Sequence, residues 1–356
     1  MFMKKQFFLM GMAALAFVSC SKDETAEVNH GDAIGFRTPA ITRGTETTLD
    51  GLGDFYVTAY EQSGNANYFT NVQFTKQSDN SYTSSPSYYW PASGNLTFYA
   101  FWPGNELSSK MNISNGKQEL TDFEPATLIS AQQDVIVATA TGNKTANEET
   151  GVALNFKHVL SQILVKAKNT NSNYTYKVKG VRIGMPVSKG SLDLSTITSI
   201  TTWTPSAGPN DKAKYEITYD TEHTLGGEPV SIMDQASQST NGAAMLIPQQ
   251  LVAWDPSGDP DNTKSKGAYL SVNVQITTTA GAQVYPATGD YGWVAVPIST
   301  NWEAGKKYTY TLDFSTGGGK VDPEDPDNPG TDVLGGAIKF TVDIATWTDS
   351  AQDLTM

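Results

Sequence analysis

Residues 96–103 read Leu-Thr-Phe-Tyr-Ala-Phe-Trp-Pro, a short apolar run that ends at a Trp-Pro pair. Aromatic and β-branched side chains favour extended backbone. Proline ends the run because it has no N–H to donate to a β-ladder. Residues 81–90 close on a second such pair, Trp90-Pro91. Two strands with this ending indicate aromatic side chains that seal the rim of a β-sandwich.

Similar runs occur along most of the chain, separated by Gly, Asn, Asp, Ser and Pro, and long stretches of helical periodicity are missing. The predicted strands are residues 54–61, 66–75, 81–90, 96–102, 134–140, 152–168, 174–184, 190–194, 214–219, 243–247, 268–279, 291–298 and 307–314. Many short strands at this spacing predict an all-β fold of two tandem antiparallel β-sandwich domains, of transthyretin or immunoglobulin type. We place the domains at residues 45–157 and 158–316.

The N-terminus has the pattern of an export signal. Lys4 and Lys5 precede an apolar run over residues 7–18, which is too short to cross a bilayer because a spanning helix needs about 20 residues. The run ends at Val18-Ser19-Cys20, which resembles a bacterial lipobox, and Cys20 is the only cysteine. We predict a lipoprotein signal peptide over residues 1–20 and a lipid on Cys20. Ordinary signal cleavage and a fortuitous cysteine are the alternatives.

Charge limits the partners. The net charge is −13, which disfavours binding to nucleic acid or to anionic headgroups and suits a surface protein. Residues 21–44 begin with a polar tether and continue into an alternating segment at Ala33-Ile-Gly-Phe36. After residue 20 no apolar stretch approaches membrane-spanning length.

The C-terminal 40 residues contain two contrasting segments. Residues 317–336 are rich in Gly, Pro and acids, and this composition predicts a flexible linker. Within residues 337–356, a strand with one apolar face follows: Ile338, Phe340, Val342 and Ile344. Ala337-Ile-Lys-Phe340 repeats the pattern of the early segment, so the two strands could occupy the same groove. The alternative is that the terminal strand completes its own domain.

Motifs for catalysis are missing from the sequence, and we expect neither an enzyme nor a cofactor. His30, His158 and His223 lie far apart, and His158 is expected to order a turn by hydrogen bonding. Acidic clusters near Asp255 and Asp322 lack EF-hand spacing and are interrupted by proline, so we expect solvated loops and no metal.

Tryptophan offers one binding alternative, because a group of indole rings can form a platform for sugars. The seven tryptophans are Trp90, Trp102, Trp203, Trp254, Trp293, Trp302 and Trp347. The alternative function is therefore a monomeric surface lipoprotein that binds glycans through β-sandwich aromatics.

Taken in order, several segments resemble fimbrillin subunits of lipoprotein-derived (type V) pili. They are Cys20, Ile34 and Phe36 followed by Thr42-Arg43-Gly44, residues 154–161, residues 245–249, residues 302–312, and the terminal Ile338, Phe340, Val342 and Trp347. These pieces extend over nearly the whole chain.

The resemblance implies a function and a processing route. Such subunits are two-domain outer-membrane lipoproteins that a trypsin-like protease cuts after an arginine behind the first strand. Arg43 fits that position best, and Arg37 is the runner-up. Cutting opens a groove that the terminal strand of another fimbrial subunit fills. The implied partners are other subunits by strand exchange, the membrane through the precursor's lipid, and a host surface protein or glycan in adhesion. The implied location is the outer membrane for the precursor and a surface fimbrium for the mature form.

Overall fold

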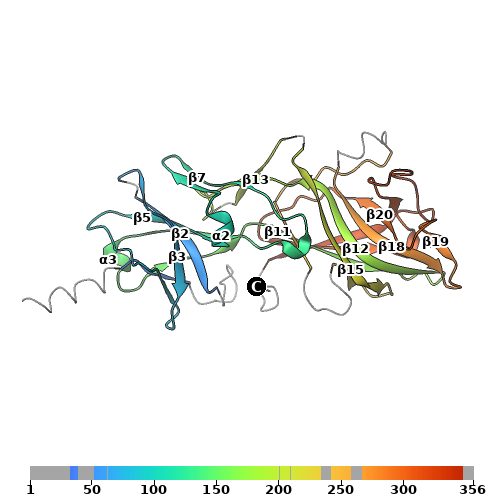
Figure 1. Cartoon of the computed structure of the whole chain (residues 1–356), viewed down its shortest axis with the longest axis horizontal. Helices are drawn as coiled ribbons and strands as arrows, with labels where there is room; N and C mark the ends of the chain where they lie inside the picture. Colours follow the sequence, from blue (N-terminus) through green and yellow to red (C-terminus); the bar gives the residue numbers. More distant parts are fainter. Residues whose placement is uncertain are drawn as a thin grey trace, which may run out of the picture.

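The computed structural model describes residues 33–38, 52–61, 63–199, 201–208, 210–233, 242–257 and 267–347. Within these ranges the structure is built from strands, which confirms the all-β prediction (Figure 1). The helices are single turns: α2 (Gly104–Leu107), α3 (Lys144–Asn147), η1 (Ile129–Ala131) and η2 (Phe314–Thr316). None of the described helices has the length and apolar character needed to cross a membrane.

The first half of the chain forms an eight-stranded sheet in the order β10-β8-β5-β2-β3-β4-β1-β9. The strands are β1 (Phe36–Arg37), β2 (Asp54–Glu61), β3 (Ala66–Lys76), β4 (Ser81–Thr83), β5 (Leu96–Trp102), β8 (Ile136–Gly142), β9 (Val152–Ala153) and β10 (Lys157–His158). The rings of Phe36 on β1 and Phe98 on β5 meet with centroids 5.0 Å apart, which shows that the sheet curls on itself.

The apolar run at residues 96–102 is explained by burial on both faces of β5. Phe98 and Ala100 face the core inside the curled sheet. Tyr99 and Phe101 face a second core. A four-stranded sheet in the order β14-β13-β7-β6 contributes the other side of this second core. Its strands are β6 (Met111–Ser114), β7 (Lys117–Phe123), β13 (Gly190–Asp193) and β14 (Thr202–Pro205). A strand covered on both faces is apolar throughout instead of alternating.

The second half is a sandwich of a five-stranded and a six-stranded sheet around one large core. The five strands are β11 (Ser161–Lys168), β16 (Val230–Ser231), β17 (Ala244–Leu246), β21 (Lys306–Asp313) and β23 (Lys339–Thr346). The six are β12 (Tyr174–Val187), β15 (Lys212–Thr224), β18 (Tyr269–Thr278), β19 (Gln283–Tyr285), β20 (Gly292–Pro297) and β22 (Lys320–Val321). Figure 1 shows β12, β15, β18 and β20 at the opposite end of the molecule from β2, β3 and β5.

Two details of the predicted sandwiches are corrected. The sheets are not antiparallel throughout, since β11 pairs in parallel with β21 and β1 pairs in parallel with β9. A single cut between residues 157 and 158 also does not separate the halves. Strands β13 and β14 come after that cut but share a sheet with β6 and β7 of the first half.

The expected flexible linker at residues 317–336 is also wrong as a description of this structure. The segment packs against the second half: β22 pairs with β20, and Val321 and Val333 lie in the large core. A Cβ atom at Gly317 would clash with the carbonyl group of Gly336, so glycine permits the two ends of the segment to approach closely. Most of the proline and acidic residues of the segment are partly or fully exposed.

An ion pair fixes the same segment. Asp322 is 2% exposed and accepts a hydrogen bond from Arg182 Nη1 at 3.2 Å. Burial raises the pKa of the Asp322 carboxyl above its ordinary value, although Ser271, the Glu324 amide and Arg182 all favour the ionised form. The acidic cluster predicted as a solvated loop thus contains one buried carboxylate.

Candidate strand-exchange site

Strand β1 lies between β4 and β9 and is held by its main chain on both sides. Ile34 N donates to Tyr88 O at 2.7 Å. On the other side, Val152 N donates to Gly35 O and Leu154 N donates to Arg37 O, both at 2.9 Å. These three bonds join a short segment to strands far from it in the sequence.

The side chain of Phe36 occupies the centre of the first core. It is fully buried, and its ring meets Phe74 at 4.7 Å and Phe55 at 6.0 Å in edge-to-face geometry. Ile34 is buried beside it. Burial of such side chains contributes about 1.5–3 kcal/mol each. Loss of β1 would therefore leave an apolar groove between β4 and β9.

The predicted processing sites fall at different places. Arg37 is the second residue of β1, opposite Ser81 on β4 and Ala153 on β9, and its side chain is exposed. Arg43, Cys20 and His30 lie outside the described residues.

The four predicted donor residues lie together on or next to β23, but this strand is not free. It pairs antiparallel with β21 from Asp313↔Lys339 to Lys306↔Thr346, at the edge of the five-stranded sheet. The alternative in which the terminal strand completes its own domain therefore describes this form of the chain. The prediction of a flexible terminal strand is therefore wrong for this form of the chain. Period-two alternation identifies a buried face but does not identify the sheet that covers it.

Burial of β23 in its own domain decreases along the strand. Ile338 is 4% exposed, Phe340 and Val342 are half-buried, and Ile344 is 58% exposed. Alternation places Ile344 on the same face as Phe340. Packing in its own domain therefore buries the beginning of the apolar face of β23 and leaves the end of that face exposed.

The first and last strands have the same residues at the positions that point into the core beneath β1. Ile34 and Phe36 correspond to Ile338 and Phe340. The intervening Gly35 corresponds to Lys339, and a Cβ at Gly35 would lie 3.5 Å from Tyr82 O, an ordinary contact. A lysine at this position therefore fits the main chain of the groove without a clash.

The end of β23 is attached to the first half of the chain. Trp347 is buried, and its main-chain N–H donates to Gly305 O at 2.8 Å. Its ring stacks on His158, which hydrogen-bonds through Nδ1 to the carboxylate of Asp134. His158 is thus buried and hydrogen-bonded, but it lies in strand β10 and bonds to a carboxylate on a distant segment, whereas the sequence analysis expected it to order a turn. His223 lies elsewhere, packed edge-on against Tyr219.

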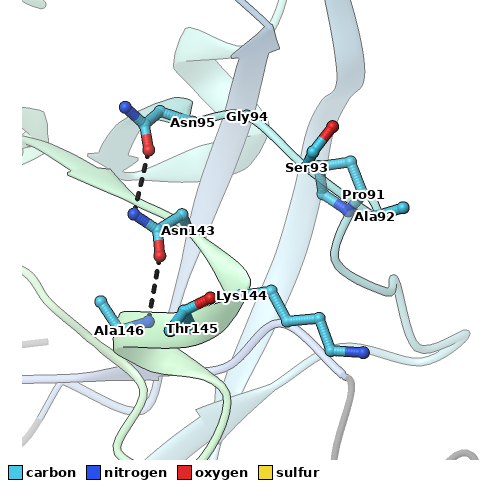
Figure 2. A pocket seen from close by; sticks show the side chains of 9 residues that line it. All are labelled: Pro91, Ala92, Ser93, Gly94, Asn95, Asn143, Lys144, Thr145 and Ala146. Atoms are coloured by element: carbon cyan, nitrogen blue, oxygen red, sulfur yellow. Dashed lines mark hydrogen bonds between the residues drawn. The ribbon is translucent and has the colours of Figure 1, made fainter.

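A hollow in the first half of the chain is lined mainly by small and polar residues. Figure 2 shows a cavity of about 560 Å³ lined by residues 91–95 and 143–146. Asn143 donates to Asn95 Oδ1 and accepts from Ala146 N, both at 3.0 Å, so its amide is occupied by neighbours. Among the residues that the structure describes, no group of three His, Cys, Asp or Glu side chains is arranged to bind a metal.

The tryptophans do not gather into one platform in the described part of the chain. Trp90, Trp254, Trp302 and Trp347 are buried in different cores. Trp293 is half-buried, with the guanidinium of Arg182 4.1 Å above its ring. Trp203 is half-buried and lines a separate cavity.

The comparisons with known proteins identify the family. The fimbrillin-like family model matches residues 38–347, and the chain therefore belongs to the fimbrillin-like family. No curated protein matches the chain.

Two solved structures are similar to the chain, and the first of them shows the same fold. A fimbrial protein from Bacteroides vulgatus ATCC 8482 is 16% identical, with a TM-score of 0.55 over 89% of this chain and 100% of that one. A candidate cell adhesion protein from Bacteroides uniformis ATCC 8492 is 15% identical, with a TM-score of 0.44 over 89% of this chain and 98% of that one. Membership of the fimbrillin-like family makes the chain a fimbrial-type surface subunit and favours a non-enzymatic role.

Proposed function

We propose that this chain is exported as a lipoprotein with the lipid on Cys20, is cut after Arg43, and polymerises by strand donation. The terminal strand of one copy fills the groove that β1 leaves in the next. The observation that carries the proposal is the position of Phe36: a fully buried ring on a short strand between β4 and β9, with its sequence context repeated around Phe340.

Burial supports the exchange. In its own domain β23 pairs on one side only and leaves Ile344 largely exposed. The groove offers main-chain partners on both sides, as β1 shows, and an apolar floor for alternate side chains. Each buried apolar side chain contributes about 1.5–3 kcal/mol and each net hydrogen bond about 0.5–1.5 kcal/mol.

The main-chain pairing of Arg37 and the sequence before Arg43 support cleavage at Arg43 over Arg37. Peptide groups at Arg37 take part in the ladder, because Leu154 N donates to Arg37 O. A trypsin-like protease binds its substrate as an extended segment, so it would first have to pull β1 out of the sheet. Arg43 follows the end of the β1 segment and Pro39, which limits further pairing.

The distance that the donor can extend toward another molecule is set by the length of the terminal strand, and not by residues 317–336. Because residues 317–336 are packed onto the second half, the part that moves begins near Gly335 and Gly336. Eleven extended residues from 337 to 347 span roughly 35 Å. This length is sufficient to run along a groove in a neighbouring molecule.

Limited trypsin digestion of purified precursor tests the proposal. We expect a stable product that begins at Gly44, followed by SDS-resistant ladders. Arg43→Ala should block both, whereas Arg37→Ala should block neither. A processed chain that lacks residues 337–356 should stay folded without forming ladders. Ladders from that truncated chain would contradict donation by the terminal strand.

Lipidation is tested separately with Cys20→Ala. This variant should lose metabolic labelling by fatty acid and membrane attachment while keeping trypsin-dependent assembly after purification. Labelling that persists in Cys20→Ala would contradict the lipid assignment alone.

A further inference from the structure

Where the two halves meet, three chain segments line a cavity of about 540 Å³ that is open to solvent. Its walls are residues 201–205, which include β14, residues 248–250, and residues 301–304 between β20 and β21. This volume lies in the range of about 300–1,000 Å³ that is usual for small-molecule sites. No residue of β1, β4, β9 or β23 lines it.

The walls are held in place by hydrogen bonds between them. Trp302 N donates to Gln249 O at 2.8 Å, and Gln250 Nε2 donates to Ser299 O at 2.8 Å. Gln249 is buried, and its side chain is occupied by both the N–H and the carbonyl of Val187. The cavity therefore exists before any ligand arrives.

Trp203 supplies an aromatic wall with a fixed orientation. Its Nε1–H donates to Val159 O at 2.6 Å, and its ring packs against Phe123 with centroids 5.9 Å apart. The side chain is nevertheless only half-buried. A ring already held in this way loses little rotamer freedom when a ligand stacks on its accessible part.

Around the indole, the exposed lining side chains are uncharged hydrogen-bonding groups and one carboxylate. They are Thr202, Gln250, Asn301 and Glu303. The described lining contains no Lys, Arg or His, and the whole chain has a net charge of −13. This electrostatic field repels anionic ligands. A fixed aromatic face beside amide, hydroxyl and carboxylate groups matches a ligand with an apolar C–H face and several hydroxyl groups.

We propose that this cavity binds a neutral saccharide. The sugar stacks a C–H face on Trp203, and its hydroxyl groups hydrogen-bond with Asn301, Gln250 and Glu303. The carboxylate of Glu303 and the lack of basic side chains in the described lining disfavour sialylated and sulfated sugars. The subunit thus carries a glycan site that is separate from its assembly groove.

The test uses the Arg43→Ala precursor, so that binding does not depend on processing or polymerisation. This protein is applied to a glycan array that carries neutral mannose-, galactose- and N-acetyllactosamine-terminated chains together with their sialylated forms. The bound neutral glycans are then titrated by calorimetry. We expect binding to neutral chains only.

Three variants locate the site. Trp203→Ala should weaken binding at least about tenfold, because it removes the stacking surface. Asn301→Ala changes an exposed side chain and should weaken binding about 3- to 10-fold while the melting temperature stays unchanged. Asn173→Ala, an exposed asparagine outside the cavity, is the matched control and should bind normally.

Binding to sialylated chains alone, binding that survives both cavity variants, or no binding to any neutral glycan on the array would each overturn the proposal. Because the precursor is used, none of these results bears on strand donation. Failure of the trypsin-dependent ladders would likewise leave the glycan site in place.

Discussion

The indole ring of Trp347 stacks on the imidazole ring of His158, with centroids 4.2 Å apart and planes inclined by 8°. Trp347 directly follows β23, and His158 ends β10 of the eight-stranded sheet. The contact therefore attaches the last described residue of the chain to the first half of the molecule. Release of β23 for donation requires this stacked pair to separate.

Trp347→Ala should loosen β23 in the unprocessed chain. The strand lies at a sheet edge, and local opening of such elements needs less free energy than global unfolding. We expect faster amide hydrogen exchange over residues 339–346 and little change in β12 or β18. Thr346→Ala, at an exposed neighbouring position, is the control. Unchanged protection of β23 in Trp347→Ala would show that the stacked pair does not hold the strand.

Phe36→Ala should destabilise the precursor by about 3–5 kcal/mol, the usual cost of truncating a buried phenylalanine. The reason is the loss of contacts with Phe55, Phe74 and Phe98, which leaves a cavity in the first core. Urea unfolding followed by tryptophan fluorescence measures the change. Arg37→Ala, with an exposed side chain on the same strand, should change stability by no more than about 0.5 kcal/mol.

The buried pair of Arg182 and Asp322 predicts a non-additive response. Arg182 is bonded to Glu216 as well, at 3.0 Å, and lies over Trp293. Arg182→Met alone should cost about 3–5 kcal/mol, because it leaves the buried Asp322 carboxylate without its cationic partner. Asp322→Asn alone should cost less, because Arg182 keeps its ion pair with Glu216. Arg182→Met combined with Asp322→Asn should cost less than the sum of the two single losses. Chemical denaturation of the unchanged protein, the two single variants and the double variant gives the coupling energy. Additive losses would contradict a direct interaction between Arg182 and Asp322.

How far the sequence predicted this structure depends on what each segment packs against. Alternation at Ile338, Phe340 and Val342 correctly predicted a strand with one buried face. It did not specify β21 as the partner, because the same face also suits another groove. Residues 317–336 looked like a linker by composition, and only the fold brings Arg182 to Asp322 and places Val321 in the core.

In the four-stranded sheet, β13 was predicted at residues 190–194, whereas β6, β7 and β14 were missed for a related reason. Strands β6 and β7 are a short, polar hairpin, and their few inward residues, such as Ile113 and Leu120, do not give a clear alternating pattern. Their partner β13 comes about 70 residues later, so no local pattern connects them. The alternating apolar residues Ile34 and Phe36 indicated a buried early segment, and both are buried. The cavity at Trp203 arises from three distant segments and had no sequence signal beyond the tryptophan itself.

Alkaline pH should weaken the second half of the molecule. Tyr176 is 1% exposed, and burial raises its pKa to about 12 from an ordinary value of 10.0. Its contribution to stability is complete below pH 10 and is lost as the pH rises toward 12, because only the unfolded chain ionises freely in that interval. The expected loss is about 2 kcal/mol. Tyr176→Phe should show a shallower fall in melting temperature between pH 10 and 12 than the unchanged protein or Tyr68→Phe, an exposed control.

Ile338 and Ile344 form a matched pair that separates the role of β23 in its own domain from its role as a donor. Ile338 is 4% exposed, so Ile338→Ala should destabilise the precursor by about 2–5 kcal/mol. Ile344 is 58% exposed, so Ile344→Ala should change the free energy of unfolding by no more than about 0.5 kcal/mol. In the groove, however, Ile344 would fall at the position of Ala40, on the apolar face.

Ile344→Asp should therefore leave the precursor stable but reduce SDS-resistant ladders after trypsin treatment, because a charge on that face would have to be buried without a partner. Thr341→Asp, on the opposite face of the same strand, is the control for added charge and should assemble normally. Melting curves of the precursors and gels of the processed chains give the two readouts. If Ile344→Asp assembled as well as Thr341→Asp, this end of the strand would lie outside the groove, and donation would be confined to Ile338 through Val342.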